Sequence, residues 1–164
     1  MKSIANHGSQ GTAPLDSHWK SILECAALEV FEMMAGTTLE TNPDPAAEPC
    51  GEQTAMVGLA GALCGMITLR CSKETSGKLA SLMLGGDAAS NPSTARDALG
   101  ELCNMIAGNF KAKVSNLADH CMLSVPTVIT GDNYQMDTVE PAEGLGLALI
   151  FDGQPLWVSL ITHE

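Results

Sequence analysis

The chain has 164 residues and a formal net charge of −11. This length suits one domain with a sizeable core, and an acidic balance without any run of Lys or Arg argues against nucleic acid or an anionic membrane as a partner. The six cysteines form no Cys-x-x-Cys pair and no Cys/His cluster with zinc-ligand spacing, so we expect reduced thiols, no bound metal and a cytoplasmic setting.

The first third of the chain predicts a tail, a helix and an irregular segment. Residues 1–14 are small and polar without an apolar signal-peptide core, so we expect a flexible tail over 1–14 and one domain over 15–164. A helix should begin at Asp16 or Ser17 and stop at Gly36. Three prolines within residues 40–51 exclude regular structure there. The stripe of this helix that we expect in the core is Trp19, Ile22, Leu23, Ala26, Val30 and Met34.

The next stretch predicts a hairpin and a second helix. Short apolar runs over 55–61 and 64–70, separated by a glycine-containing turn, indicate two paired strands. A helix over 72–84 follows and should end at Gly85 and Gly86. We expect its buried side to carry Leu79, Leu82 and Met83.

A long helix is predicted from Ser93 or Thr94 to about Asn116, with two opposed faces. Its apolar residues recur at helical spacing: Leu99, Leu102, Ile106, Phe110 and Val114. Its polar stripe is Asp97, Glu101, Asn104, Gly108, Lys111 and Ser115. Such a stripe is commonly the solvated side of a helix. However, glycine inside a helix costs about 1 kcal/mol relative to alanine, and close approach by another chain would give Gly108 a purpose.

The last part of the chain predicts strands. Residues 121–130 form a strand that Pro126 interrupts, which places this proline at an edge or a bulge. Residues 131–144 are polar and loop-like, with a short strand near 134–139. Strands over 145–151 and 156–162 are joined by Asp152 and Gly153, a strong hairpin signal.

Two helical segments also resemble each other. Residues 28–36 align with 100–108, and four aligned pairs are identical: Glu29/Glu101, Met33/Met105, Ala35/Ala107 and Gly36/Gly108. Strand segments follow in both copies, 65–69 in the first and 146–150 in the second. The first copy carries Glu32 where the second carries Asn104.

The series Asp97, Glu101 and Asn104 on one helix, with Pro126 downstream, resembles the active-site signature of the CheC/CheX/FliY family of chemotaxis phosphatases, and CheX-like members above all. The resemblance implies an α+β fold within the broad α/β class: an antiparallel sheet packed with long helices and an internal pseudo-twofold. Because Glu32 replaces the asparagine in the first copy, it also implies one site per chain.

The resemblance further implies hydrolysis of the phosphoaspartate of a CheY-like receiver domain, which brings its own Mg²⁺ and a lysine. Asn104 would orient the attacking water and Glu101 would engage the lysine, while the protein needs no cofactor of its own. The residues expected to contact the partner are Asp97, Gly108, Lys111 and Pro126. A homodimer through a sheet edge is implied as well.

Two alternatives remain from the residues alone. The same stripe could dock a receiver without hydrolysing anything, as an adaptor or a dimeric scaffold in two-component signalling. Pro126 could simply break the ladder of its strand.

Overall fold

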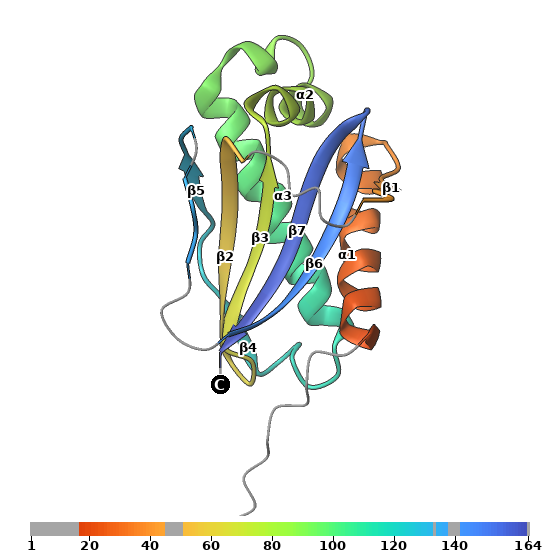
Figure 1. The fold of residues 1–164 in the computed structure, drawn as a ribbon, viewed down its shortest axis with the longest axis vertical. Coiled ribbons are helices and arrows are strands. Elements are labelled where there is room, and N and C mark those ends of the chain that lie inside the picture. Colours follow the sequence, from red (N-terminus) through yellow and green to blue (C-terminus); the bar gives the residue numbers. More distant parts are fainter. Residues whose placement is uncertain (1–16, 45–50, 133, 138–141, 164) are drawn as a thin grey trace, which may run out of the picture.

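The computed structural model describes residues 17–44, 51–132, 134–137 and 142–163 (Figure 1). The tail expected over residues 1–14 lies outside these ranges. Within the described ranges, three α-helices and one short 3-10 helix accompany a single seven-stranded sheet in which every pairing is antiparallel. The predicted α+β architecture with an antiparallel sheet is therefore confirmed.

The strands occur in the order β1-β6-β7-β3-β2-β4, and β5 also pairs with β2. Two hairpins, β2–β3 and β6–β7, form the body of this sheet. In chain order the elements are α1 Ser17–Ala35, β1 Glu40–Thr41, β2 Gln53–Gly61, β3 Gly65–Cys71, α2 Lys73–Leu84, η1 Ala88–Ser90, α3 Pro92–Lys113, β4 Cys121–Leu123, β5 Thr127–Thr130, β6 Ala142–Phe151 and β7 Gln154–His163.

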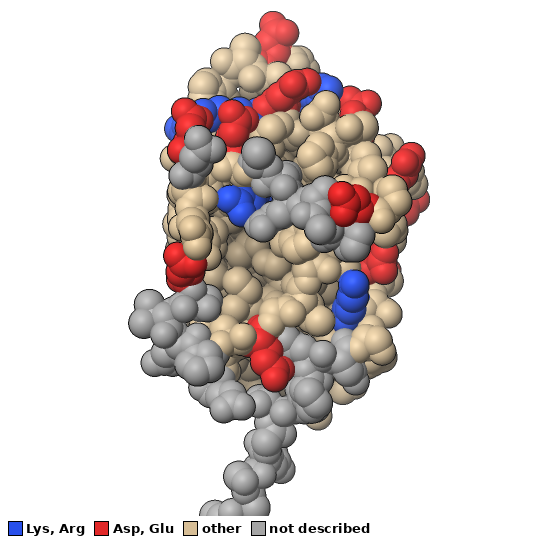
Figure 2. Space-filling view, viewed as in Figure 1, with Lys and Arg blue, Asp and Glu red and all other residues tan. Residues whose placement is uncertain are grey.

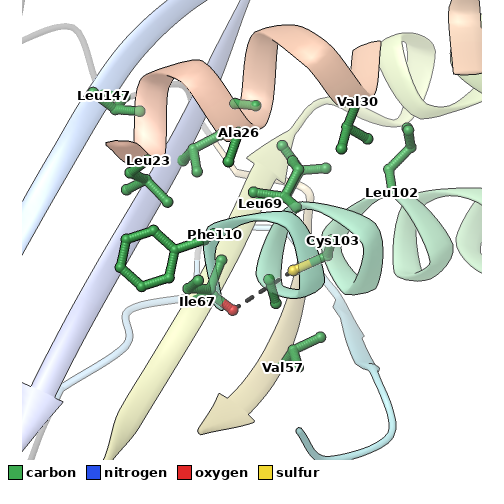
Figure 3. Packing of buried hydrophobic residues seen from close by; sticks show 14 of the residues in the cluster. Leu23, Ala26, Val30, Val57, Ile67, Leu69, Leu102, Cys103, Phe110 and Leu147 are labelled. Carbon is green, nitrogen blue, oxygen red and sulfur yellow. Dashed lines mark hydrogen bonds between the residues drawn. The ribbon is translucent and has the colours of Figure 1, made fainter. Parts of the chain in front are cut away.

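Helices α1 and α3 lie side by side on one face of the sheet, and α2 closes one end (Figure 1). Among the described residues, no helix covers the other face. Figure 2 shows that face, with acidic groups mostly around its margin and mostly uncharged residues in its middle. The core therefore fills the space between the helix pair and the sheet. Figure 3 shows side chains of this core, among them Val30 of α1, Leu102 and Phe110 of α3, and Ile67 and Leu69 of β3.

Helix α1 has the predicted limits and the predicted buried side. Gly36 follows its last residue with a φ of 62°, a conformation that glycine adopts without strain. Leu23, Ala26 and Val30 are buried, and the remaining members of the predicted stripe, Trp19, Ile22 and Met34, pack partly buried against the same core. Phe31 is buried too, so the apolar face is wider than the predicted stripe.

One residue of helix α2 that we predicted to lie in the core is exposed instead. Ser72 caps the helix by accepting a hydrogen bond from the Thr75 backbone N–H, and Gly85 ends it with a φ of 76°. Leu79 is fully buried, but Leu82 is 53 % exposed. The reason is the position of the helix: α2 meets α3 through Ala80, so the side that carries Leu82 has no neighbour to bury it.

Helix α3 begins slightly earlier and ends slightly earlier than predicted. The side chain of Asn91 accepts hydrogen bonds from the backbone N–H groups of Ser93 and Thr94, so Asn91 is the cap. Pro92 fits the first turn because its missing N–H has no partner to lose there. The helix ends at Lys113, where Val114 becomes extended.

The irregular regions differ from the prediction in three details. Residues 142–144, predicted as part of a loop, already belong to β6. A two-residue strand, β1, precedes Pro43, and residues 45–50 lie outside the described part of the chain. Residues 134–137 form no strand, and 138–139 are not described. The hairpin at Asp152 and Gly153 is confirmed, with positive φ values of 47° and 72°.

The connections follow one order twice: a helix, an edge strand and a hairpin. Strand β1 follows α1 but pairs with β6, whereas β4 and β5 follow α3 but pair with β2. Each edge strand thus completes the hairpin of the other half. This order makes β7 the counterpart of β3. The sequence predicts segments 65–69 and 146–150 as the strands that follow the two repeats. They occupy different places in the sheet, because the first belongs to β3 and the second to β6.

Candidate active site

The two faces of α3 are as predicted. Leu99, Leu102, Ile106 and Phe110 have no exposed surface, and Val114 just beyond the helix is also buried. On the opposite side no residue of the stripe is buried: Asp97, Glu101 and Ser115 are exposed, and Asn104, Gly108 and Lys111 are partly exposed. A rigid helix, fixed to the core along its full length, therefore presents these polar groups to solvent.

Glu101 and Asn104 have no role in holding the described part of the fold together, and the same is true of Asp97 and Lys111 on this stripe. No hydrogen bond or ion pair joins the Glu101 or Asn104 side chain to another residue in the described ranges. Residues three apart on a helix project from the same side. A carboxylate and a carboxamide thus stand together, both able to interact with an outside molecule.

Among the described residues, no neighbour of position 108 requires a glycine there. A Cβ atom placed there would have nothing within 4 Å. Gly100, one face over on the same helix, is different: a Cβ there would lie 3.4 Å from Val128 and 3.5 Å from Pro126. The bare surface at Gly108 therefore widens the space above the stripe.

Pro126 belongs to a bulge that touches α3. Leu123 pairs with Leu59 and Thr127 pairs with Met56, so the three residues 124–126 oppose only residues 57 and 58 of β2. Such an extra residue bends the strand and redirects its side chains. Here it sets the Pro126 ring against Gly100, the residue before Glu101.

The bulge lies beside one particular part of the stripe. Gly100 and Asn104 are four residues apart, which is about one helical turn, so they point in nearly the same direction. Glu101 is rotated by about 100° from Gly100. Pro126 therefore flanks the stripe on the Asn104 side, and two segments that are distant in sequence meet there.

Cys103 holds α3 onto the sheet. Its thiol donates weakly to the carbonyl oxygens of Ala55 and Ile67, each at 3.6 Å, and Figure 3 shows the link to Ile67. Burial raises the pKa of this thiol to about 12, so it stays neutral. Cys103 is a buried structural residue, whereas the neighbouring Asn104 is partly exposed.

Glu29 of α1 ties the two long helices together. Its carboxylate accepts hydrogen bonds from the Lys113 ammonium and from the Asn109 amide, each at 2.8 Å. These contacts, with Lys113 first, lower the pKa of Glu29 to about 2. Glu29 aligns with Glu101 in sequence, yet it is engaged on both sides, so it has no carboxylate oxygen poised for a partner in the way Glu101 does.

The uncovered sheet face contains a hollow of about 300 Å³ that Thr54, Thr68, Arg70 and Trp157 help to line. Its hydroxyl groups are already paired: Thr54 with Tyr134 at 2.5 Å, and Thr68 with Ser159 at 2.6 Å. The Arg70 guanidinium lies over the Tyr134 ring. These contacts secure the loop that carries Tyr134 to the sheet.

The described residues contain neither a cluster of metal ligands nor a helix suited to cross a membrane. Among them, no three His, Cys, Asp or Glu side chains gather in a group that could hold a metal ion. No helix in the described ranges combines the length and apolar character needed to cross a bilayer.

Comparison with known protein families gives one match that covers more than half of the chain. The family model described as chemotaxis phosphatase CheX matches residues 53–148. A curated relative, the CheY-P phosphatase CheX of Thermotoga maritima, is 35% identical over 77 residues, which is 46% of this chain and 50% of that protein. The chain thus spans about half the length of the curated relative it matches.

Solved structures show the same fold. A chemotaxis protein CheX from Vibrio vulnificus has a TM-score of 0.77 at 16% identity, covering 90% of this chain and 97% of its own. The CheX-CheY-BeF3-Mg²⁺ complex from Borrelia burgdorferi has a TM-score of 0.74 at 24% identity, covering 89% and 98%. FliY of Thermotoga maritima has a TM-score of 0.61 at 18% identity, covering 90% and 91%.

Proposed function

The chain belongs to the CheX family of chemotaxis phosphatases, and on that basis we propose that it hydrolyses the phosphoaspartate of a CheY-like receiver domain. The observation that supports this most directly is the pair Glu101 and Asn104: one side chain is exposed, the other is partly exposed, and both are unengaged on a helix that the core fixes in place. A CheY-like partner agrees with the Borrelia burgdorferi structure, which is a complex of CheX with CheY, BeF3 and Mg²⁺.

The chemistry assigned to this chain is the positioning of water. The receiver contributes the acyl phosphate, the Mg²⁺ and a lysine, and phosphoryl transfer depends mainly on alignment and charge stabilisation. The Asn104 carbonyl oxygen accepts a hydrogen bond from one water molecule and so points the oxygen of that water at phosphorus. The water attacks, the bond between phosphorus and the aspartate oxygen breaks, and the products are phosphate and a free carboxylate.

Glu101 binds the receiver rather than the water. Its carboxylate accepts a hydrogen bond from the receiver lysine, a charge-assisted contact of about 1.5–3 kcal/mol. Gly108 lets the receiver approach the helix closely. Asp97, Lys111 and Pro126 lie around these groups and complete the contact surface.

The test is a set of alanine variants assayed with receiver phosphorylated by acetyl phosphate. Asn104→Ala should lower kcat by about a hundredfold and leave receiver binding nearly unchanged, because only the alignment of water is lost. Glu101→Ala should weaken both binding and turnover. Glu32→Ala on α1 is the matched control, since Glu32 is exposed and aligns with Asn104 in the repeat.

Two results would decide against hydrolysis by these residues. A Glu101/Asn104 double alanine variant that releases phosphate at the wild-type rate would refute their roles. Tight binding of the phosphorylated receiver without faster phosphate release by the wild-type protein would identify an adaptor.

We also propose the two remaining features that the family resemblance implies, an internal pseudo-twofold and a homodimer through a sheet edge. The repeated order of helix, edge strand and hairpin supports the first. For the second, the outer strands β1 and β4–β5 are short, so a dimer would pair only a few residues per chain. Sedimentation equilibrium should give twice the chain mass, and a monomer at all concentrations would exclude the dimer.

A further inference from the structure

The bulge beside α3 carries an unusually exposed apolar side chain. Val125 is 82 % exposed, more than any other large hydrophobic residue in the described ranges, and Met122 follows at 76 %. An isolated exposed apolar residue is common on protein surfaces and does not by itself mark a binding site. Val125, however, does not lie on a free loop.

The residues on both sides of Val125 are fixed. The Ser124 backbone N–H donates to the Gly58 carbonyl oxygen at 2.9 Å, and the Ser124 hydroxyl accepts from the Gly58 N–H at 2.8 Å. On the other side, the Pro126 ring rests on Gly100. Val125 is therefore held out into solvent by a rigid backbone, which is a preorganised arrangement for binding.

The position of Val125 relative to the stripe gives this exposure a use. Val125 is directly bonded to Pro126, which flanks the stripe on the Asn104 side. The stripe itself consists of charged residues, an amide and a glycine, so it offers no apolar contact. Specific interfaces nevertheless have an apolar centre or anchor beside their polar groups.

We propose that Val125 is an apolar anchor for the receiver domain, which it contacts next to the hydrolytic site. The inference rests on the proposed function and extends it, because it assigns affinity to the bulge and chemistry to the helix. The occupant is the receiver because Pro126 joins the bulge to α3 at Gly100, so the bulge and the site proposed for the receiver form one continuous surface. Val125 is then a binding residue, and its loss should leave the chemical step intact.

Met122 provides a matched control on the same edge segment. It pairs with Ala60 on β2, whose neighbour Leu59 points into the core. Because side chains alternate along a strand, Ala60 and Met122 point to the face of the sheet that the helices do not cover. An aspartate at position 122 adds the same charge to the same short strand region, but on the far side from α3.

The experiment compares Val125→Asp, Val125→Thr and Met122→Asp with the wild type, using receiver charged with acetyl phosphate. We expect Val125→Asp to raise KM about tenfold, which corresponds to about 1.4 kcal/mol, with kcat within about twofold of wild type. Val125→Thr keeps the shape and should give a smaller rise in KM. Met122→Asp should leave both constants unchanged. Thermal melts of each variant establish that the fold is retained.

The outcomes separate the two proposals. If the wild type and Asn104→Ala differ as expected but Val125→Asp has a wild-type KM, the anchor is refuted and the proposed function stands. If the wild type neither binds nor dephosphorylates the receiver, both fall. If Val125→Asp dissociates a dimer while the KM for receiver is unchanged, the occupant is a second copy of the chain and the anchor is again refuted.

Discussion

Substituting alanine for Gly108 should make the protein more stable and a poorer phosphatase. Glycine inside a helix costs about 1 kcal/mol relative to alanine, and the new Cβ would have nothing within 4 Å. The free energy of unfolding should therefore rise by about 1 kcal/mol. For a chain of 164 residues this raises Tm by about 2–4 °C.

The same methyl group should obstruct the partner. If the receiver packs closely over Gly108, an added carbon overpacks that contact and costs about 1–3 kcal/mol of binding. KM for phosphorylated receiver should rise accordingly, while the Asn104 and Glu101 side chains keep their places. Stability and affinity thus change in opposite directions, an outcome that general damage to the fold cannot produce.

Gly77 in α2 is the control for this substitution. A Cβ at Gly77 would lie 3.3 Å from the Ala89 carbonyl oxygen, so Gly77→Ala should gain less stability than Gly108→Ala, or lose some, and should not affect KM. Circular dichroism melts and steady-state phosphate release measure both effects. A Gly108→Ala variant with a lower Tm, or one with a higher Tm and a wild-type KM, would refute the reasoning.

Three further predictions concern the remainder of the fold. Contacts led by the Lys113 hydrogen bond lower the pKa of Glu29 from 4.5 to about 2, so the stability from ionised Glu29 is present above pH 4.5 and is lost as the pH falls towards 2. Glu29→Gln should flatten this part of a plot of Tm against pH. An unchanged slope would contradict a stabilising role for the contacts of Glu29 with Lys113 and Asn109. Burial raises the pKa of the Cys103 thiol to about 12 whereas Cys64 is exposed, so mass spectrometry after brief iodoacetamide treatment of the native protein should find Cys64 modified and Cys103 intact. Gly153 has a φ of 72°, so Gly153→Ala should lower the free energy of unfolding by about 1 kcal/mol in a urea titration.

Local patterns in the sequence were sufficient to predict most elements and the exposed stripe. The faces of α3 follow from spacing alone, because a helix against a single core has one apolar side. The turn at Asp152 and Gly153 is equally local, since its positive φ values restrict which residues fit. These features depend on neighbours along the chain, which the sequence contains directly.

The parts that sequence reasoning missed depend on contacts between distant segments. The contact of Pro126 with Gly100 requires the register of β4 and β5 on β2, which a single sequence does not define. The exposure of Leu82 depends on where α2 sits, not on its own periodicity. Strand β1 has only two residues and exists because β6 lies beside it.

Glu29 illustrates a third kind of gap. Glu29 is exposed, but its hydrogen bonds with Asn109 and Lys113 depend on the packing of α1 against α3, which the sequence alone does not define. The repeat is the signal in the sequence that points to this difference. It places identical glutamates, Glu29 and Glu101, at equivalent helix positions, and only one of them binds other residues of the protein. Only the structure shows that Glu29 is hydrogen-bonded and that Glu101 is not.

The pairing of each edge strand with the opposite hairpin bears on how the chain is made. Glu40 lies beside Ile150, so the neighbour of β1 emerges from the ribosome more than a hundred residues later. The amino-terminal portion cannot close its sheet while synthesis continues, and it exposes apolar surface until the last hairpin arrives. A chain interrupted before residue 142 should therefore require chaperones and should be degraded rather than accumulate as a half-sized domain.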